Sequence, residues 1–228
     1  MTLHQDTRVP LIKILAFIAI SALISGISYY IRENYLFFTG LQSSTFRVIR
    51  MTVVYILFPF WWAMTKLGTR MGEFGLTTKN LKESLLYGSL VYAIALGIFI
   101  YNLNNSTFYS AFAGGYEQMT LAELILTGTL FSWMAAVTDI WTRGFILLQV
   151  TKYSNATFGV LMQNCTWVLV HLYEIAILAP VLSLPGAITL TLVLGTTGDV
   201  AALKTHNIVG LAFGHVMLNI GFMAYVIL

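Results

Sequence analysis

An acidic and a basic residue lie four positions apart inside a long apolar run, at Asp139 and Arg143. An ionisable side chain in hydrocarbon costs about 3 kcal/mol unless it is paired or faces a polar cavity. Positions i and i+4 of a helix share a face, so the two side chains could simply neutralise each other. The other interpretation is that they belong to a functional site.

Two later apolar segments also carry polar side chains. His171 ends the run Trp167-Val168-Leu169-Val170-His171, and His215 lies one helical turn before Asn219. Three separate segments therefore place ionisable or amide groups in apolar surroundings. This distribution favours one shared polar chamber, lined by all three segments, over a single neutralised pair.

The composition indicates an integral membrane protein. Of the 228 residues 58% are hydrophobic and only 9% are charged, whereas a soluble domain usually has about 25% charged residues. The apolar runs are long and do not alternate with period two, which predicts helices and not a barrel. The net charge of +3 requires no nucleic-acid partner, because Lys and Arg cluster in short segments between the apolar runs.

We predict an all-α fold, a polytopic transmembrane bundle of about seven helices in a single domain over residues 1–228. The first apolar run lacks a clear cleavage site, so we interpret it as a retained helix and not as a signal peptide. The basic connection Thr65–Glu83 predicts a cytoplasmic loop and a cytoplasmic amino terminus, with Arg47 and Arg50 on the outer side before the second span. The expected spans are Leu11–Tyr30, Met51–Met64, Ser84–Tyr101, Leu121–Val150, Thr157–Leu178, Ala187–Gly195 and Asn207–Leu228.

An acid, two histidines and an amide in one wet chamber could hydrolyse an amide bond. Asp139 and His171 would polarise and deprotonate a water molecule. His215 and Asn219, which point the same way because they are four residues apart, would donate hydrogen bonds to the oxyanion. Arg143 would line the same cavity.

The order of these residues resembles the three motifs of the CAAX-protease and bacteriocin-processing family, also called abortive-infection proteins. The similar positions are Asp139 and Arg143-Gly144 for EExxxR, Trp167 and His171 for FxxxH, and His215 and Asn219 for HxxxN. The resemblance covers about residues 72–225, and the stretch Gly72-Glu73-Phe74-Gly75-Leu76 is similar to the approach to a family helix.

The resemblance implies a membrane endopeptidase that needs no cofactor and acts on a membrane-associated or lipidated peptide. It also implies that the first-motif glutamate and the second-motif histidine activate water. Here Thr138 occupies the first glutamate position and cannot act as a base near neutral pH, while Asp139 occupies the second and is one methylene shorter than glutamate. Glu174 could supply a carboxylate, but we interpret it and Glu123 as polar residues near the outer membrane surface.

Other interpretations stay open. The protein could be a catalytically inactive relative that binds or assembles with another membrane protein, which Thr138 favours. Asp139, His171 and His215 could instead ligate zinc with one open position. The two histidines could also be the axial ligands of a haem. A transporter is less favoured, because the sequence shows no internal duplication.

Overall fold

The computed structural model describes residues 8–35, 40–112, 116 and 119–227, and all regular elements within these ranges are helical. The predicted all-α class is thereby confirmed. The elements in chain order are α1 Arg8–Tyr35, α2 Gly40–Met51, η1 Thr52–Leu57, α3 Phe58–Lys66, η2 Met71–Phe74, α4 Leu81–Asn102, α5 Ser106–Phe112, α6 Leu121–Asp139, η3 Ile140–Leu147, α7 Leu148–Tyr153, α8 Ala156–Val170, α9 Leu172–Leu182, α10 Leu184–Thr205 and α11 Val209–Ile227.

Several of these helices can cross a membrane, as expected for a multi-pass integral membrane protein. In the described part of the chain, five segments are long and apolar enough on their own: Arg8–Ser28, Gln42–Lys66, Leu81–Asn102, Leu121–Tyr153 and Leu184–Thr205. A sixth candidate is α8 together with α9, which are bent by 78° relative to each other, and α11 is a shorter apolar helix.

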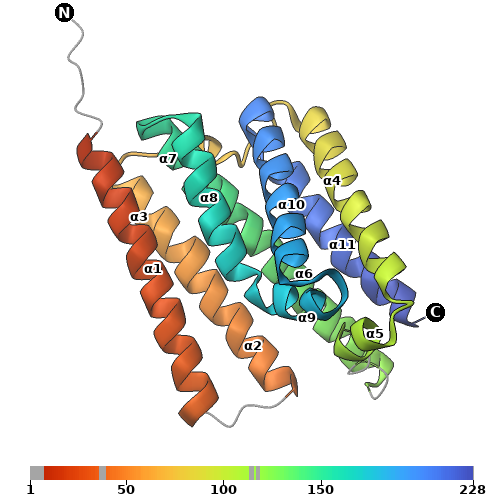
Figure 1. The fold of residues 1–228 in the computed structure, drawn as a ribbon. Coiled ribbons are helices and arrows are strands. Elements are labelled where there is room, and N and C mark those ends of the chain that lie inside the picture. Colours follow the sequence, from red (N-terminus) through yellow and green to blue (C-terminus); the bar gives the residue numbers. More distant parts are fainter. Residues whose placement is uncertain (1–7, 36–39, 113–115, 117–118, 228) are drawn as a thin grey trace, which may run out of the picture.

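The helices form two neighbouring groups (Figure 1). The α1 helix and the continuous α2–η1–α3 rod stand side by side on one flank, whereas α4 and α11 form the other flank. The continuous α6–η3–α7 rod runs between the flanks and contacts α11, α2 and α8. This rod therefore brings Asp139 and Arg143 within reach of both groups.

Two segments are longer than the sequence indicated. The second span begins at Gln42, so Arg47 and Arg50 lie inside the helix and not before it. The long arm of Arg50 makes this possible, since its Nη1 donates a hydrogen bond to the Ser25 carbonyl of α1 at 3.2 Å. The sixth span continues beyond Gly195 to Thr205 and so encloses Asp199.

Glycines allow α4 and α11 to pack at very short range. A Cβ atom on Gly88 would lie 2.0 Å from the carbonyl oxygen of Gly210, so no larger residue fits without moving a helix. Close approach through small residues is a common way for membrane helices to associate, since lipid gives no hydrophobic reason for them to do so. The contact holds His215 of α11 and Tyr92 of α4 in one fixed relative position.

Candidate functional site

The carboxylate of Asp139 is fully buried at the last residue of α6 and accepts hydrogen bonds from three helices. Its Oδ2 atom receives one from the hydroxyl of Tyr92 at 2.8 Å and another from Nδ1 of His215 at 2.8 Å. Arg143 pairs with Oδ1 from one turn further along the same rod. The predicted Asp139–Arg143 pair is thus present, but it is only one part of a larger network.

Arg143 is also fully buried, and it lies between two carboxylates. Its Nε lies 3.4 Å from Oδ1 of Asp199, and Nη2 donates to the Gly195 carbonyl at 3.2 Å. The guanidinium stacks over the ring of Trp167, 4.2 Å from the ring centroid. A Cβ on Gly198 would lie 2.3 Å from Nη2, so glycine leaves the space that the guanidinium needs.

The helix changes from α to the wider π form directly after Asp139. Residues Ile140–Leu147 form the π-helical segment η3. Such segments are rare in proteins, but where they occur they are often part of a functional site. Thr138 lies just before it, and its hydroxyl donates to the carbonyl of Met134 in its own helix at 2.9 Å. Thr138 therefore contributes no hydrogen bond to Asp139 or Arg143 in the described structure.

His171 lies at the break between α8 and α9, whereas the sequence indicated an unbroken helix through this point. Its Nδ1 lies 2.8 Å from the Trp167 carbonyl, four residues earlier. The ring packs at a tilt of 40° against Trp167, with centroids 4.1 Å apart. It faces the ring of His215 at a centroid distance of 6.2 Å, with 16° between the two planes. The two histidines from distant segments therefore meet, as predicted.

The hydrogen bonds fix the tautomers of both imidazoles. A carboxylate and a backbone carbonyl can only accept, so Nδ1 of His215 and Nδ1 of His171 must each carry the proton. In the neutral ring, Nε2 is then a lone-pair acceptor. Neither Nε2 has a hydrogen-bond partner among the described residues, so both are available to a water molecule or a substrate.

The pairing differs from the expected roles. From the sequence we expected Asp139 and His171 to act together as the base. In the structure, Asp139 is instead hydrogen-bonded to His215. Asn219 donates to the Phe131 carbonyl of α6 at 3.4 Å, and this is the only hydrogen bond of its amide within the described residues. The difference arises because α11 packs directly against α6, whereas Nδ1 of His171 is bonded to the Trp167 carbonyl of its own segment.

Three residues of the network were not identified from the sequence: Tyr92, Asp199 and Asn164. Asp199 carried a recognisable signal, since it lies in an otherwise apolar run, but the helix was expected to end before it. Asn164 donates to Oδ2 of Asp199 at 3.3 Å. Tyr92 had no such signal, because tyrosine is common on apolar helix faces.

Glu123 and Glu174, the two further acidic residues considered from the sequence, lie outside this network. Glu123 forms a capping box with Thr120 at the start of α6, where each side chain bonds the other residue's backbone N–H. Glu174 lies in the first turn of α9, and its Oε2 is buried without a hydrogen-bond partner among the residues that the structure describes. Glu174 makes no hydrogen bond to Asp139, so the structure gives no sign that it replaces a missing carboxylate.

The zinc interpretation lacks a suitable ligand set. Among the described residues, no three His, Cys, Asp or Glu side chains are arranged to hold a metal ion. Both oxygens of Asp139 already accept hydrogen bonds, and the proton on Nδ1 of His215 points at that carboxylate. The same atoms are better placed to move a proton than to bind a cation.

The chain matches no protein-family model, and comparison with curated proteins and with solved structures finds no significant match.

Proposed function

We propose that this protein is an intramembrane peptidase that hydrolyses a peptide bond of a membrane-associated or lipidated peptide. The observation that supports this function best is the buried pair of His215 and Asp139, with the second imidazole of His171 facing it. A histidine held through Nδ1 by a carboxylate is an effective general base, because the carboxylate stabilises the imidazolium that forms.

The proposed reaction starts with a water molecule bound to the two Nε2 atoms. Nε2 of His215 takes a proton from this water while the water oxygen attacks the carbonyl carbon of the peptide bond. The resulting imidazolium is stabilised by Asp139, and it then returns the proton to the leaving amine as the C–N bond breaks. Nε2 of His171 accepts a hydrogen bond from the same water and orients it.

The remaining residues of the network would keep the base in place. Tyr92 and Arg143 both donate to Asp139, which favours the ionised carboxylate and fixes its orientation. The Asn219 amide has a second N–H, beyond the one directed at Phe131, that could donate to the oxyanion. We place the basic connection between α3 and α4, and with it the amino terminus, on the cytoplasmic side of the membrane.

The test is a cleavage assay on the full chain, purified without a histidine tag and reconstituted in lipid nanodiscs. A library of quenched fluorescent peptides, with and without a prenyl group, serves as substrate. His215→Ala and Asp139→Asn should each lower the cleavage rate by about 10² to 10⁴-fold, as expected when a general base is lost. If either variant cleaved the peptides as fast as the natural protein does, the proposal would be contradicted.

A matched control is available at His206, which is exposed at the end of α10 with φ +49°. His206→Asn removes an imidazole, and asparagine tolerates this left-handed backbone conformation. This variant should cleave at the rate of the natural protein. A loss in His206→Asn equal to that in His215→Ala would show that the effect is not specific to the buried pair.

A second candidate function is binding to another membrane protein, by a catalytically inactive relative of such peptidases. It is favoured by Thr138, whose hydroxyl is bonded within its own helix, and by Asp139, whose three donors suit a purely structural role. In that case cleavage is absent in the natural protein and appears only when Thr138→Glu and Asp139→Glu are combined. A partner that co-purifies equally well with His215→Ala would support this alternative.

A further inference from the structure

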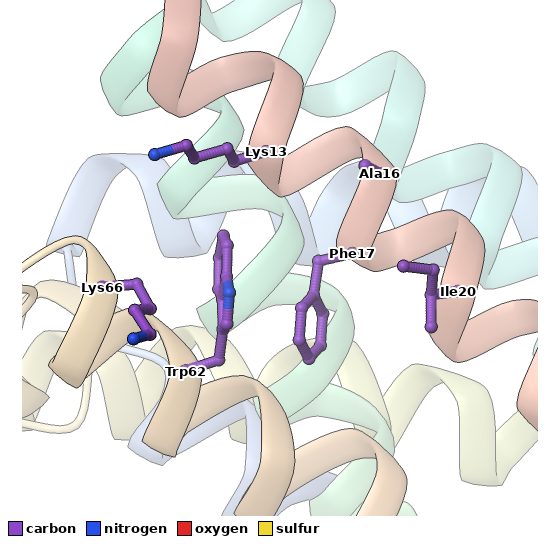
Figure 2. A pocket seen from close by; sticks show the side chains of 6 residues that line it. All are labelled: Lys13, Ala16, Phe17, Ile20, Trp62 and Lys66. Atoms are coloured by element: carbon purple, nitrogen blue, oxygen red, sulfur yellow. The ribbon is translucent and has the colours of Figure 1, made fainter.

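A cavity lies between α1 and α3, and Figure 2 shows the side chains that line it. Its volume is about 410 Å³, within the range of small-molecule sites. The lining residues are Lys13, Ala16, Phe17, Ile20, Trp62 and Lys66. They form a slot with two cationic side chains and an apolar floor, and no acidic residue is among them.

The ammonium groups of the two lysines lie toward one end of the slot. Figure 2 shows the side chains of Lys13 and Lys66 on one side of the Trp62 ring, with Phe17 and Ile20 on its other side. Neither ammonium group has an ion-pair or hydrogen-bond partner among the described residues. Both cations lie at the same end of the slot with no anion beside them, so an anion bound there would be stabilised.

The apolar end is built from aromatic rings. Phe17 and Trp62 pack with centroids 4.8 Å apart, and Phe17 also contacts Phe58 at 5.0 Å. Ile20 on the next turn of α1 is 49% exposed, so the apolar surface continues along the outside of the helix. A ligand held at the lysines would thus find an uninterrupted apolar track running toward the middle of the span.

The positions of the two lysines in the candidate spans indicate that the slot lies close to one membrane surface. Lys13 is near the beginning of the first candidate span, Arg8–Ser28, and Lys66 is the last residue of the second, Gln42–Lys66. Lipid phosphates lie at this depth, and basic pockets between helix ends are known to select anionic headgroups. The order of groups in the slot, cations at the surface and apolar side chains below, matches the order of groups in a phospholipid.

We propose that this slot is a binding site for an anionic phospholipid. The ammonium groups of Lys13 and Lys66 hold the headgroup phosphate, and one acyl chain lies along Trp62, Phe17 and Ile20. The site is separate from the proposed peptidase centre, and it would anchor the α1–α3 flank in an anionic leaflet.

The experiment uses the full chain in nanodiscs of phosphatidylcholine with a minor fraction of phosphatidylglycerol. Native mass spectrometry of the released protein counts the retained lipids, and titration of phosphatidylglycerol gives the affinity. The natural protein should retain phosphatidylglycerol in preference to phosphatidylcholine. Combined Lys13→Gln and Lys66→Gln should weaken this retention about thirtyfold, as expected for two lysines near the headgroup.

The matched control removes the same charge outside the slot. Lys79 and Lys82 are exposed in the basic connection and at the start of α4, so combined Lys79→Gln and Lys82→Gln should change retention by less than about threefold. If both double variants lost phosphatidylglycerol equally, a general basic surface and not this slot would hold the lipid, and the proposal would be overturned.

Two further measurements test whether the cavity and the acyl chain are needed for binding. Ala16→Phe fills the slot but leaves both lysines, and it should also weaken retention, which shows that the cavity itself is needed even if the lysine variants fold poorly. Millimolar inorganic phosphate should not displace the lipid, because it lacks the acyl chain. Displacement by phosphate, or full retention in Ala16→Phe, would mean that the slot is not a phospholipid site.

Discussion

The two groups of helices are held together by different physical interactions. In the α1–α3 flank, Phe17 lies at the centre of an aromatic cluster, with Trp62, Phe58 and Phe145 at centroid distances between 4.8 and 5.7 Å. The second group, in which α4, α10 and α11 surround the α6–η3 rod, has a network of buried charges at its centre, with Asp139, Arg143 and Asp199 all at 0% exposure. Ring packing tolerates substitutions of similar volume, whereas each buried charge depends on its partner.

The largest effect should come from removing the cation that two carboxylates share. Arg143→Met would leave Asp139 and Asp199 facing each other without a counter-charge. We expect a loss of about 3 to 5 kcal/mol in the free energy of unfolding, measured by titration with a denaturing detergent. Lys82→Met, at an exposed position, is the control and should change stability little. A loss below about 1 kcal/mol in Arg143→Met would mean that the network is not a tightly coupled unit.

A smaller loss is expected when the close helix contact beside the network is opened. Gly88→Ala would place a methyl group 2.0 Å from the Gly210 carbonyl oxygen, so α4 and α11 must separate. Overpacking of this kind costs about 1 to 3 kcal/mol. Gly97→Ala in the same helix is the matched control, because its Cβ would meet no atom within 4 Å. Equal stability of the two variants would show that the helices can shift without cost.

The aromatic flank should be more tolerant. Phe17→Leu keeps an apolar side chain of similar size but loses three ring contacts, and we expect about 1 kcal/mol of destabilisation. The control is Ile20→Leu, one turn along α1 at an exposed position. If Phe17→Leu were as damaging as Arg143→Met, the contrast between the two groups of helices would be wrong.

The smallest effect concerns the connection between the two groups. Glu73 of η2 pairs with Lys152 at the end of α7, and the hydrogen bond from that ammonium lowers the pKa of the Glu73 carboxyl below its usual 4.5. The stability contributed by the pair is complete above pH 4.5 and is lost as the pH falls through the lowered pKa.

The Glu73 pair is partly exposed, so its contribution should be only about 0.5 kcal/mol. Glu73→Gln should remove this part of the pH dependence while leaving stability unchanged at a pH below the lowered pKa of Glu73, as followed by thermal unfolding at several pH values. An unchanged pH profile in the variant would show that the pair does not contribute.

Much of the fold could be predicted from the sequence, because the cost of exposing backbone polar groups to lipid leaves few alternatives to helices. The long apolar runs gave the helical segments, and the presence of Asp139, His171 and His215 in such runs indicated that they meet. The ends of the helices were less predictable. Arg50 and Asp199 were expected outside the spans, yet both lie inside them. Arg50 donates a hydrogen bond to the Ser25 carbonyl of α1, and Asp199 pairs with Arg143 of η3.

The sequence alone determined the class of the protein and the local i, i+4 pair of Asp139 and Arg143, since both depend only on composition and helix geometry. Tertiary structure decided which histidine bonds Asp139, that Asp199 is the second partner of Arg143, and that the chain bends by 78° at His171. These features depend on how far one helix is rotated and shifted against another. Glycines such as Gly88 and Gly198 set that distance, and only the packed structure shows what fills the space they leave.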